Sequence, residues 1–352
     1  MALDEIVARI REAAQRGAPL RIRGGGTKDF YGEPLREGGE LSMLPLAGIV
    51  SYEPSELVVT VRAGTRLAEL EDVLAERGQC LAFEPPHFAG GATVGGMIAA
   101  GLSGPARASV GPVRDYVLGL MMINGTGELL TFGGQVMKNV AGYDVSRLMV
   151  GALGTLGVIV EASLKILPMA PAQATLKFEM AQTEALQRLN EWGGQPLPLN
   201  ASCWVDGVLH LRLRGAVAAV EAACRNLGGD REEIDWTACR DQTLPWFSAR
   251  GDHDLWRLSV PQAAPVLDLP QPPLVEWHGA QRWVRAGAQD AARIREAAVR
   301  AGGHATLFVA ADAHTPHRFT PLADPLHRIH AQLKREFDPA GVFNPGRLYP
   351  GL

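Results

Sequence analysis

Three glycine-rich segments in the first half of the chain have the composition of sites that hold phosphate groups. They are Arg23-Gly24-Gly25-Gly26-Thr27, Ala92-Thr93-Val94-Gly95-Gly96 and Gly151-Ala152-Leu153-Gly154-Thr155-Leu156-Gly157. Each adjoins an apolar run typical of a strand or a helix. A glycine at such a place lets main-chain N–H groups approach an anion without a Cβ in the way. The pattern therefore predicts a protein built around a dinucleotide.

The first segment differs from the common phosphate-binding motifs. No Gly-Lys-Ser/Thr follows it, and it lacks the glycine spacing of the dinucleotide fingerprint. Taken alone, a triple glycine is more often a flexible turn than a ligand site. Its place after a short strand, with the Thr27 hydroxyl and the cations of Arg23 and Lys28, favours a pyrophosphate-binding nest. The second segment, taken alone, fits a tightly packed structural helix better than a ligand site.

Composition narrows the class of protein. The chain has 352 residues, and 34 Lys and Arg against 38 Asp and Glu leave a net charge of −4. Such a balance provides no basic field for nucleic acid. The four cysteines include no Cys-x-x-Cys pair, so the sequence predicts reduced thiols and neither a structural zinc site nor an iron–sulfur cluster.

The N-terminal region and the hydropathy indicate where the protein is found. Acidic residues, Asp4 and Glu5, stand where a signal peptide needs basic ones. No apolar run approaches the roughly 18 residues of a membrane span. We therefore expect a cytoplasmic protein without direct membrane insertion, and expect any membrane association to come through partner subunits.

Alternating strands and helices are expected to position the glycine segments. Residues 3–16 have apolar side chains at helical spacing, and Leu20-Arg21-Ile22-Arg23 reads as a strand that leads into the first segment. A strand over 57–62 and a helix after an N-cap at Thr65 follow. Asn124-Gly125-Thr126-Gly127 predicts a hairpin, and alternating apolar residues over 158–166 predict a half-buried strand.

Beyond Pro168 the pattern changes to hairpins followed by helices. One such set ends in a helix over 216–227, and a second ends in a strand over 305–309, which predicts a loosely duplicated α+β module. A last helix is expected to be capped by Asp324 and to carry one apolar face, formed by Leu326, Ile329, Leu333 and Phe337. The tail Phe343-Asn344-Pro345-Gly346-Arg347 follows it.

Several segments together resemble a known flavoprotein family. Residues 20–168 are similar to the FAD-binding domain of the vanillyl-alcohol oxidase and p-cresol methylhydroxylase (PCMH) family. More narrowly, nearly the whole chain resembles the FAD-binding E subunits of bacterial glycolate oxidases. The segments that carry these resemblances are 23–27, 54–59, 84–87, 92–101, 113–119, Gly134 to Asp144, 151–159, 301–306 and 337–347.

The resemblance implies a fold and a division into domains. The fold is α+β, with a two-subdomain PCMH-type FAD-binding domain over 1–170 and a reduced α+β cap domain over 171–318. A C-terminal helix and tail over 319–352 are expected to return to the FAD-binding domain. The flavin and its phosphates are expected to contact Arg23, Gly24, Gly25, Gly26, Thr27, Thr93, Val94, Gly95, Gly96, Gly101, Gly154, Gly157, Ile159, Asn344 and Arg347.

The glycine loop and the histidines refine the expected site. Covalent-flavin relatives use a His or Cys, often in the first glycine loop, and this loop has neither, so we expect noncovalent FAD. The His-rich metal motif of related hydroxyacid dehydrogenases is missing, so we expect no metal. The catalytic residues stay unassigned. His304 and Arg318 are weak candidates, and for the histidines a structural role is the favoured interpretation.

The resemblance implies an FAD-dependent oxidation of glycolate, a small 2-hydroxy acid, to glyoxylate. A hydride would pass from Cα of glycolate to N5 of the flavin. Because the chain lacks cluster cysteines, its expected partners are a homologous FAD-binding glycolate oxidase subunit and an iron–sulfur subunit. Two alternatives stay open, namely a stand-alone flavin oxidoreductase for 2-hydroxy acids or sugars, and a flavin-stabilised assembly subunit without chemistry of its own.

Overall fold

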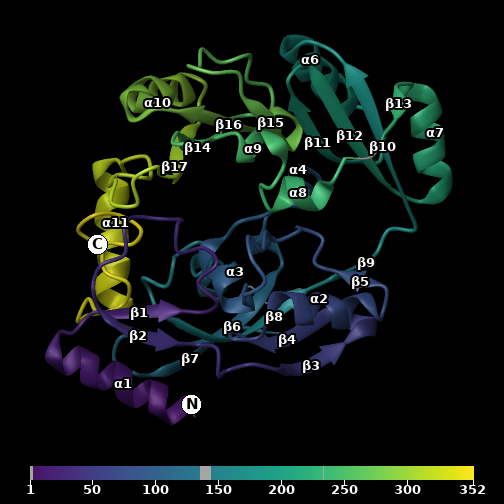
Figure 1. Cartoon of the computed structure of the whole chain (residues 1–352). Coiled ribbons are helices and arrows are strands. Elements are labelled where there is room, and N and C mark those ends of the chain that lie inside the picture. Colours follow the sequence, from purple (N-terminus) through teal and green to yellow (C-terminus); the bar gives the residue numbers. More distant parts are fainter. Residues whose placement is uncertain (1–2, 135–143, 233) are drawn as a thin grey trace. The chain divides into compact units, whose positions relative to one another are not determined.

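The structure is a computed structural model that describes residues 3–134, 144–232 and 234–352. The chain divides into two compact units. The first is built from Met1–Leu102, Pro112–Pro168 and His314–Leu352, and the second from Ser103–Gly111 and Met169–Ala313. Figure 1 labels most of their helices and strands. Most of the motif expected between Gly134 and Asp144 lies outside the described residues.

The first unit combines a five-stranded antiparallel sheet, in the order β3-β4-β8-β6-β7, with two small two-stranded sheets, β1-β2 and β5-β9. Its elements are α1 (Leu3–Arg16), β1 (Leu20–Arg23), β2 (Gly39–Ser42), β3 (Ile49–Glu53), η1 (Pro54–Glu56), β4 (Val58–Arg62), α2 (Leu67–Ala75), β5 (Gln79–Cys80), α3 (Val94–Ala100), η2 (Val113–Asp115), β6 (Val117–Ile123), β7 (Leu129–Gly133), α5 (Val145–Leu148), β8 (Val158–Lys165), β9 (Leu167–Pro168) and α11 (Asp324–Phe337).

The core of the first unit joins segments that are far apart in the sequence. Ile6 and Ile10 of α1 are fully buried in one cluster with Val158 of β8 and with Phe343 of the C-terminal tail. The expected helix over 3–16 is confirmed, because its apolar residues recur on one face and that face is buried. Burial of the tail residue fixes the end of the chain beside β1, whose N–H at Leu20 donates to the carbonyl of Val342.

Local turns and caps agree with the sequence only in part. The hairpin at Asn124 is confirmed by the antiparallel pairing of β6 with β7. The expected N-cap at Thr65 is wrong, since the hydroxyl of Thr65 bonds to the main chain of Gly48 and α2 begins after Arg66. The expected cap at Asp324 is also wrong. The N-cap of α11 is Ala323, and Asp324 is already helical.

The second unit is one eight-stranded antiparallel sheet in the order β13-β10-β12-β11-β15-β16-β14-β17. Its elements are α4 (Arg107–Val110), β10 (Ala172–Glu179), α6 (Gln182–Gly193), β11 (Leu199–Val205), β12 (Val208–Gly215), α7 (Val217–Leu227), β13 (Asp230–Arg231), α8 (Trp236–Arg240), α9 (Pro245–Ser248), β14 (Asp254–Ser259), β15 (Leu274–Glu276), η3 (Trp277–Gly279), β16 (Gln281–Ala286), η4 (Ala288–Asp290), α10 (Ala291–Arg300) and β17 (His304–Val309).

Two hydrophobic clusters show how this sheet is assembled. One lies between α6, α7 and strands β10 to β12, and the other between α10 and strands β14, β16 and β17. The two halves join where β11 pairs with β15, through Cys203 opposite Glu276. The expected duplicated module therefore consists of two halves of a single sheet, each packed against its own helices. Pairing across the junction depends on long-range contacts, which periodicity in the sequence does not report.

Residues 103–111, which sequence analysis placed in the FAD-binding domain, pack with the second unit. The indole N–H of Trp277 donates to the carbonyl of Gly104 over 3.0 Å. The hydroxyl of Ser109 lies 3.0 Å from Nε2 of His278. Trp277 and His278 both have positive φ values, an uncommon conformation for residues other than glycine. These side-chain contacts hold the segment on the second unit.

Candidate functional site

The glycine segments meet at one cleft in the first unit. The cleft has two lobes, of about 60 Å³ and about 100 Å³. The residues that line both lobes come from all three segments and from the C-terminal tail. They are Ile22, Gly24, Thr93, Gly96, Ala99, Leu153 and Asn344.

The first glycine segment presents a row of unused donors to this cleft. Within the described part of the chain, no hydrogen bond uses the main-chain N–H groups of Gly24, Gly25, Gly26 or Thr27. All four residues line the larger lobe. Successive free N–H groups in a turn form an anion-binding nest. The loop therefore fits the pyrophosphate of a dinucleotide.

Close packing against a neighbouring segment explains two of these glycines. A Cβ added at Gly25 would lie 1.5 Å from the carbonyl oxygen of Gly91, and one added at Gly24 would lie 2.2 Å from Oγ1 of Thr93. Both distances are shorter than any van der Waals contact. The absence of side chains thus brings the first segment against the second.

The cations expected beside the phosphates are partly neutralised. The Arg23 guanidinium lies 3.0 Å from the Asp29 carboxylate and 3.4 Å from that of Glu40. The nearby Asp29 carboxylate raises the pKa of Arg23 above its usual value. Lys28 lines the larger lobe, and its ammonium group lies 5.4 Å from the ring centroid of Phe88. Arg23 is therefore largely neutralised by its carboxylate partners, so the main-chain N–H groups of residues 24–27 are the donors that this loop offers to an anion.

The second segment begins α3, and its first N–H groups face protein rather than the cleft. Val94 and Gly95 donate to the carbonyls of Thr65 and Ala63, and Val94 is fully buried. A Cβ at Gly95 would lie 2.7 Å from Cβ of Ala63. The hydroxyl of Thr93 caps the helix by accepting from the N–H of Gly96. The residues of this segment that line both lobes are thus Thr93 and Gly96.

The third segment forms part of the wall of the smaller lobe. Gly154, Gly157 and Ile159 all line it. The segment is tied to the end of α3, because Leu153 donates its N–H to the carbonyl of Ala99 over 2.9 Å. Gly101 ends α3 with a positive φ and lines neither lobe.

The tail binds the walls of the cleft to each other through Asn344. Its side-chain oxygen accepts the N–H of Ile22 over 2.9 Å, and its amide nitrogen donates to the carbonyl of Leu153 over 2.7 Å. One side chain therefore bridges the strand before the first glycine loop and the third segment. Both groups of the amide are used in this bridge, so Asn344 shapes the cleft.

Arg347 holds the loop that follows the first glycine segment. Its guanidinium donates to the carbonyls of Asp29, Tyr31 and Glu33, the first over 2.7 Å. The side chain is buried, and burial lowers the pKa of Arg347 to about 10. The residue lines the larger lobe, but these three carbonyls occupy most of its donors. Its main part in the site is to fix the conformation of the loop over 29–33.

Sequence analysis missed a buried lysine that supports the cleft. The ammonium group of Lys334 donates to the carbonyls of Thr155 and Phe343, each over 2.8 Å, and to the carboxylate of Asp338 over 2.7 Å. Asp338 also accepts the N–H groups of Val342 and Phe343. This Lys334–Asp338 clamp joins α11, the third segment and the tail. The four-residue spacing of a lysine in the last turn of the helix and the aspartate that ends it was the available signal.

The weak catalytic candidates lie in different units. His304 starts β17 in the second unit, and Arg318 is buried in the first. The guanidinium of Arg318 donates to the carbonyls of Thr315 and Phe30, and its main-chain N–H donates to the Glu33 carboxylate. Neither residue lines either lobe. In the described part of the chain, no group of three or more His, Cys, Asp or Glu side chains is placed to hold a metal ion.

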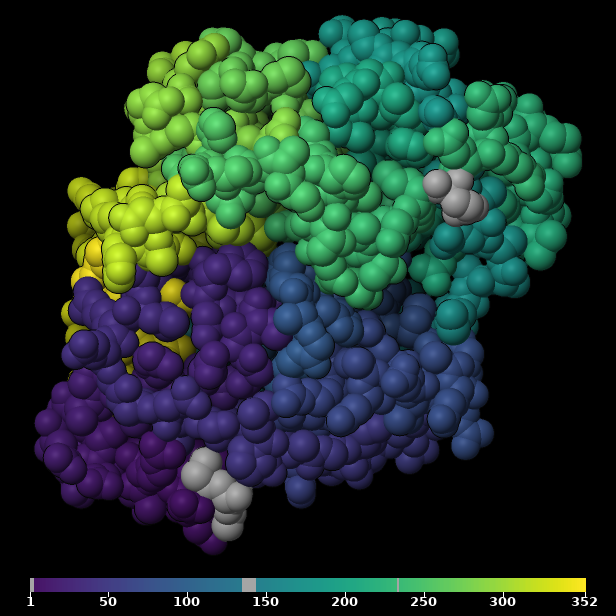
Figure 2. Space-filling model, viewed as in Figure 1, coloured from purple at the N-terminus to yellow at the C-terminus, as the bar shows by residue number. Residues whose placement is uncertain are grey.

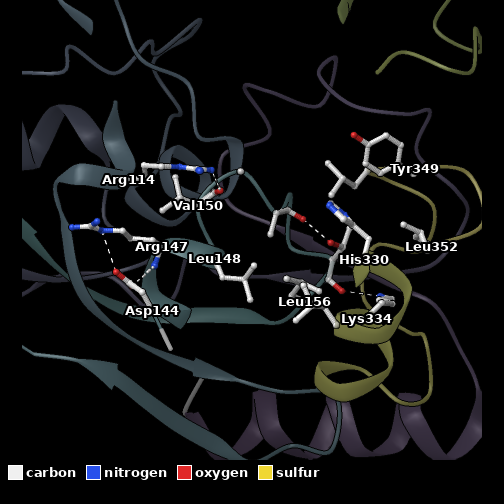
Figure 3. A pocket seen from close by; sticks show the side chains of 15 residues that line it. Arg114, Asp144, Arg147, Leu148, Val150, Leu156, His330, Lys334, Tyr349 and Leu352 are labelled. Carbon is white, nitrogen blue, oxygen red and sulfur yellow. Dashed lines mark hydrogen bonds and ion pairs between the residues drawn. The ribbon is translucent and has the colours of Figure 1, made fainter. Parts of the chain in front are cut away.

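A larger cavity of about 500 Å³ lies elsewhere in the first unit, between α11, the third segment and the end of the chain (Figure 3). None of residues 23–27 lines it. Because the free N–H groups are in the smaller cleft, that cleft is the better cofactor site. No helix in the described residues is both long and apolar enough to span a membrane.

Comparisons with known proteins agree with this assignment. A family model for the FAD binding domain matches residues 2–133. Glycolate oxidase subunit GlcE of Escherichia coli (strain K12) is 47% identical over 99% of this chain and 97% of its own length. Glycolate oxidase subunit GlcD of Bacillus subtilis (strain 168) is 33% identical over 49% of this chain and 37% of its own.

A solved structure supports the fold over nearly the whole chain. An alkyldihydroxyacetonephosphate synthase superposes with a TM-score of 0.67, covering 97% of this chain and 74% of the other, at 16% sequence identity. At this identity the likeness shows the fold alone. The near-complete match to GlcE shows the family. The chain belongs to the glycolate oxidase GlcE subunit family, within the FAD-dependent oxidoreductases that carry a PCMH-type FAD-binding domain.

Proposed function

We propose that the chain is the FAD-binding E-type subunit of a glycolate oxidase complex that oxidises glycolate to glyoxylate. The observation that carries the proposal is the row of unused N–H groups at Gly24 to Thr27, in a cleft that all three glycine segments line. The relation to GlcE over nearly its whole length identifies the substrate class.

The residues of the cleft would divide the work of holding FAD. The N–H groups of residues 24–27 would bind the pyrophosphate, and Ile159 and Gly157 would line the adenine end. Thr93 and Gly96 would pack against the cofactor. Bound FAD would supply the oxidant that accepts a hydride from Cα of glycolate. Asn344 and Arg347 would act by holding the loops in place rather than by touching the reacting atoms.

Electron transfer out of the flavin would require partner subunits. The sequence has no Cys-x-x-Cys pair, so it offers no cluster ligands for the next carrier. A homologous FAD-binding subunit and an iron–sulfur subunit would complete the complex. Noncovalent contacts are sufficient to retain FAD, because a nanomolar dissociation constant corresponds to a binding free energy of only about 12 kcal/mol.

The experiment that tests the proposal is glycolate-dependent dye reduction by the chain alone and with its partner subunits. We expect turnover only in the assembled complex, and copurification of this chain with both partners. Efficient glycolate turnover by the isolated chain, as a monomer, would refute the complex and support a stand-alone oxidoreductase.

One observation favours a second candidate, the flavin-stabilised assembly subunit. The described lining of the cleft contains no histidine, so it provides no imidazole as a proton acceptor for the substrate hydroxyl. In that case a homologous subunit would oxidise glycolate. Flavin bound to this chain would then stay oxidised when the complete complex receives glycolate without an electron acceptor.

A further inference from the structure

The last helix of the chain carries an apolar face that the fold leaves uncovered. Leu326 and Ile329 of α11 are 51% and 53% exposed, although both were expected on its apolar face. Leu326 precedes His330 by four residues, and Ile329 precedes Leu333 by four, so each lies one turn above a residue on the same face. Atoms of the C-terminal segment form part of the surface in Figure 2.

The same helix face continues into the 500 Å³ cavity. His330, Leu333 and Lys334 line this cavity, which lies within the first unit. The opposite wall comes from the third segment and α5, and the end of the chain closes one side (Figure 3). Five leucines make the walls largely apolar, namely Leu148, Leu156, Leu333, Leu348 and Leu352. The exposed stripe and the α11 residues that line the cavity therefore lie on the same face of the helix, one turn apart.

One arginine on the rim of this surface has no carboxylate partner among the described residues, whereas the other is neutralised. Arg114 and Arg147 lie on the side opposite α11 (Figure 3). Arg147 is paired with Asp144 over 3.2 Å. The guanidinium of Arg114 makes a single hydrogen bond in the described structure, 3.4 Å long, to the carbonyl of Val150. Arg114 thus has no carboxylate partner among the described residues, and it provides a site for one.

These features indicate the kind of occupant. A small molecule in the cavity would leave Leu326 and Ile329 in water, whereas a protein segment can cover both the stripe and the cavity. Exposed apolar patches of this kind mark interaction sites. We infer that the surface formed by Leu326, Ile329, the cavity and Arg114 docks an acidic, amphipathic segment of a partner subunit, an inference that rests on the proposed complex.

The test measures binding of the partner subunits to the intact, FAD-loaded chain. The variant Leu326→Asp/Ile329→Asp places two charges on the stripe. We expect it to weaken the affinity for the partner subunits by at least about tenfold, because desolvated apolar contacts dominate binding energy. The matched control is Val217→Asp/Val299→Asp, which changes two valines of α7 and α10 that are 57% and 59% exposed. We expect the control to bind like the wild type.

A second variant tests Arg114 on the rim. Arg114→Glu should lower the affinity and reduce its dependence on salt, because a rim charge acts mainly through long-range attraction. The FAD content of each isolated variant is measured first. We expect it to match the wild type, since none of the substituted residues lines the cofactor cleft.

The outcomes separate this inference from the proposed function. Wild-type chain that does not bind the partner subunits would overturn both. Unchanged affinity in the Leu326→Asp/Ile329→Asp variant would overturn the docking surface alone. Light scattering of the isolated chain tests another occupant. A dimer that the double substitution dissociates would show that a second copy occupies the surface, and would also overturn the inference.

Discussion

Removal of the Lys334 ammonium group should destabilise the segments that form the cofactor cleft. Lys334→Met keeps most of the side-chain volume and deletes three hydrogen bonds, to Thr155, Phe343 and Asp338. The Asp338 carboxylate, which is fully buried, would lose its only cationic partner among the described residues. Breaking a buried ion pair from one side costs about 3–5 kcal/mol. That is a large part of the roughly 5–15 kcal/mol that stabilises a typical domain.

Part of this cost should appear in FAD binding. Thr155 belongs to the third glycine segment and Phe343 precedes Asn344, so the clamp holds two segments whose neighbours line the cleft. FAD binding requires an ordered cleft. If about 1.4 kcal/mol of the lost stability must be supplied by FAD binding to order the cleft, the Kd for FAD rises tenfold. We expect a rise of at least that size, together with a lower unfolding midpoint.

The assays are flavin-fluorescence titration below the unfolding midpoint and denaturant unfolding of the apo-protein. Arg335→Met on the same helix is the control, because Arg335 is exposed and should leave both measurements unchanged. Adding Asp338→Asn to Lys334→Met removes the uncompensated charge and keeps an acceptor, so the double variant should recover part of the lost stability. The reasoning is refuted if Lys334→Met lies within about 0.5 kcal/mol of the wild type and binds FAD with the same Kd.

Four further predictions concern single groups. Gly25→Ala should lower the free energy of unfolding by about 1–3 kcal/mol and reduce FAD occupancy, because the new Cβ would meet the carbonyl of Gly91. Gly90 has open space around it, so Gly90→Ala should change neither the stability nor the occupancy. Asn344→Ala should reduce FAD occupancy through the loss of two hydrogen bonds that bridge the cleft walls; full occupancy would show that the bridge is dispensable. Acid precipitation should release FAD into the supernatant, and flavin retained in a washed pellet would reveal a covalent bond. Burial lowers the pKa of His278 to about 4, so the unfolded chain binds more protons between about pH 4 and 6.5, and stability should fall by up to about 3 kcal/mol as the pH drops through that range. His278→Asn, which tolerates a positive φ, should flatten that part of the stability profile, and an unchanged slope would argue against a neutral buried imidazole.

Much of the architecture follows from local signals in the sequence. The strand over 158–166 and the helix with Leu67, Leu70 and Leu74 were predicted because their apolar residues recur at the periods of a strand and an amphipathic helix, and the structure has both. The strand is more deeply buried than the expected half-buried strand, since Ile159 and Ser163 are buried as well. The hairpin at Asn124 follows from its turn residues in the same way. Such signals depend on residues within about ten positions of each other, so they can be recognised without knowledge of the tertiary contacts.

Features that depend on distant contacts were not predictable. Gly95 lines the smaller lobe, but the absence of its side chain is required by Ala63, a residue of another segment. The hydroxyl of Thr65 resembles a helix cap and instead bonds to Gly48. Lys334 reads as a solvated helix charge, and only the fold reveals the carbonyls around it. In each case the sequence gives the chemistry of the group, and the partner comes from a remote part of the chain.

An anaerobic glycolate titration of the purified chain, continued after its partner subunits are added, tests the central claim most directly. The absorption spectrum reports whether the chain holds flavin and whether glycolate reduces it. The account predicts an isolated chain that carries bound FAD, and flavin reduction by glycolate in the assembled complex. A well-folded isolated chain that binds no FAD would contradict the assignment of the cleft lined by Gly24 to Thr27.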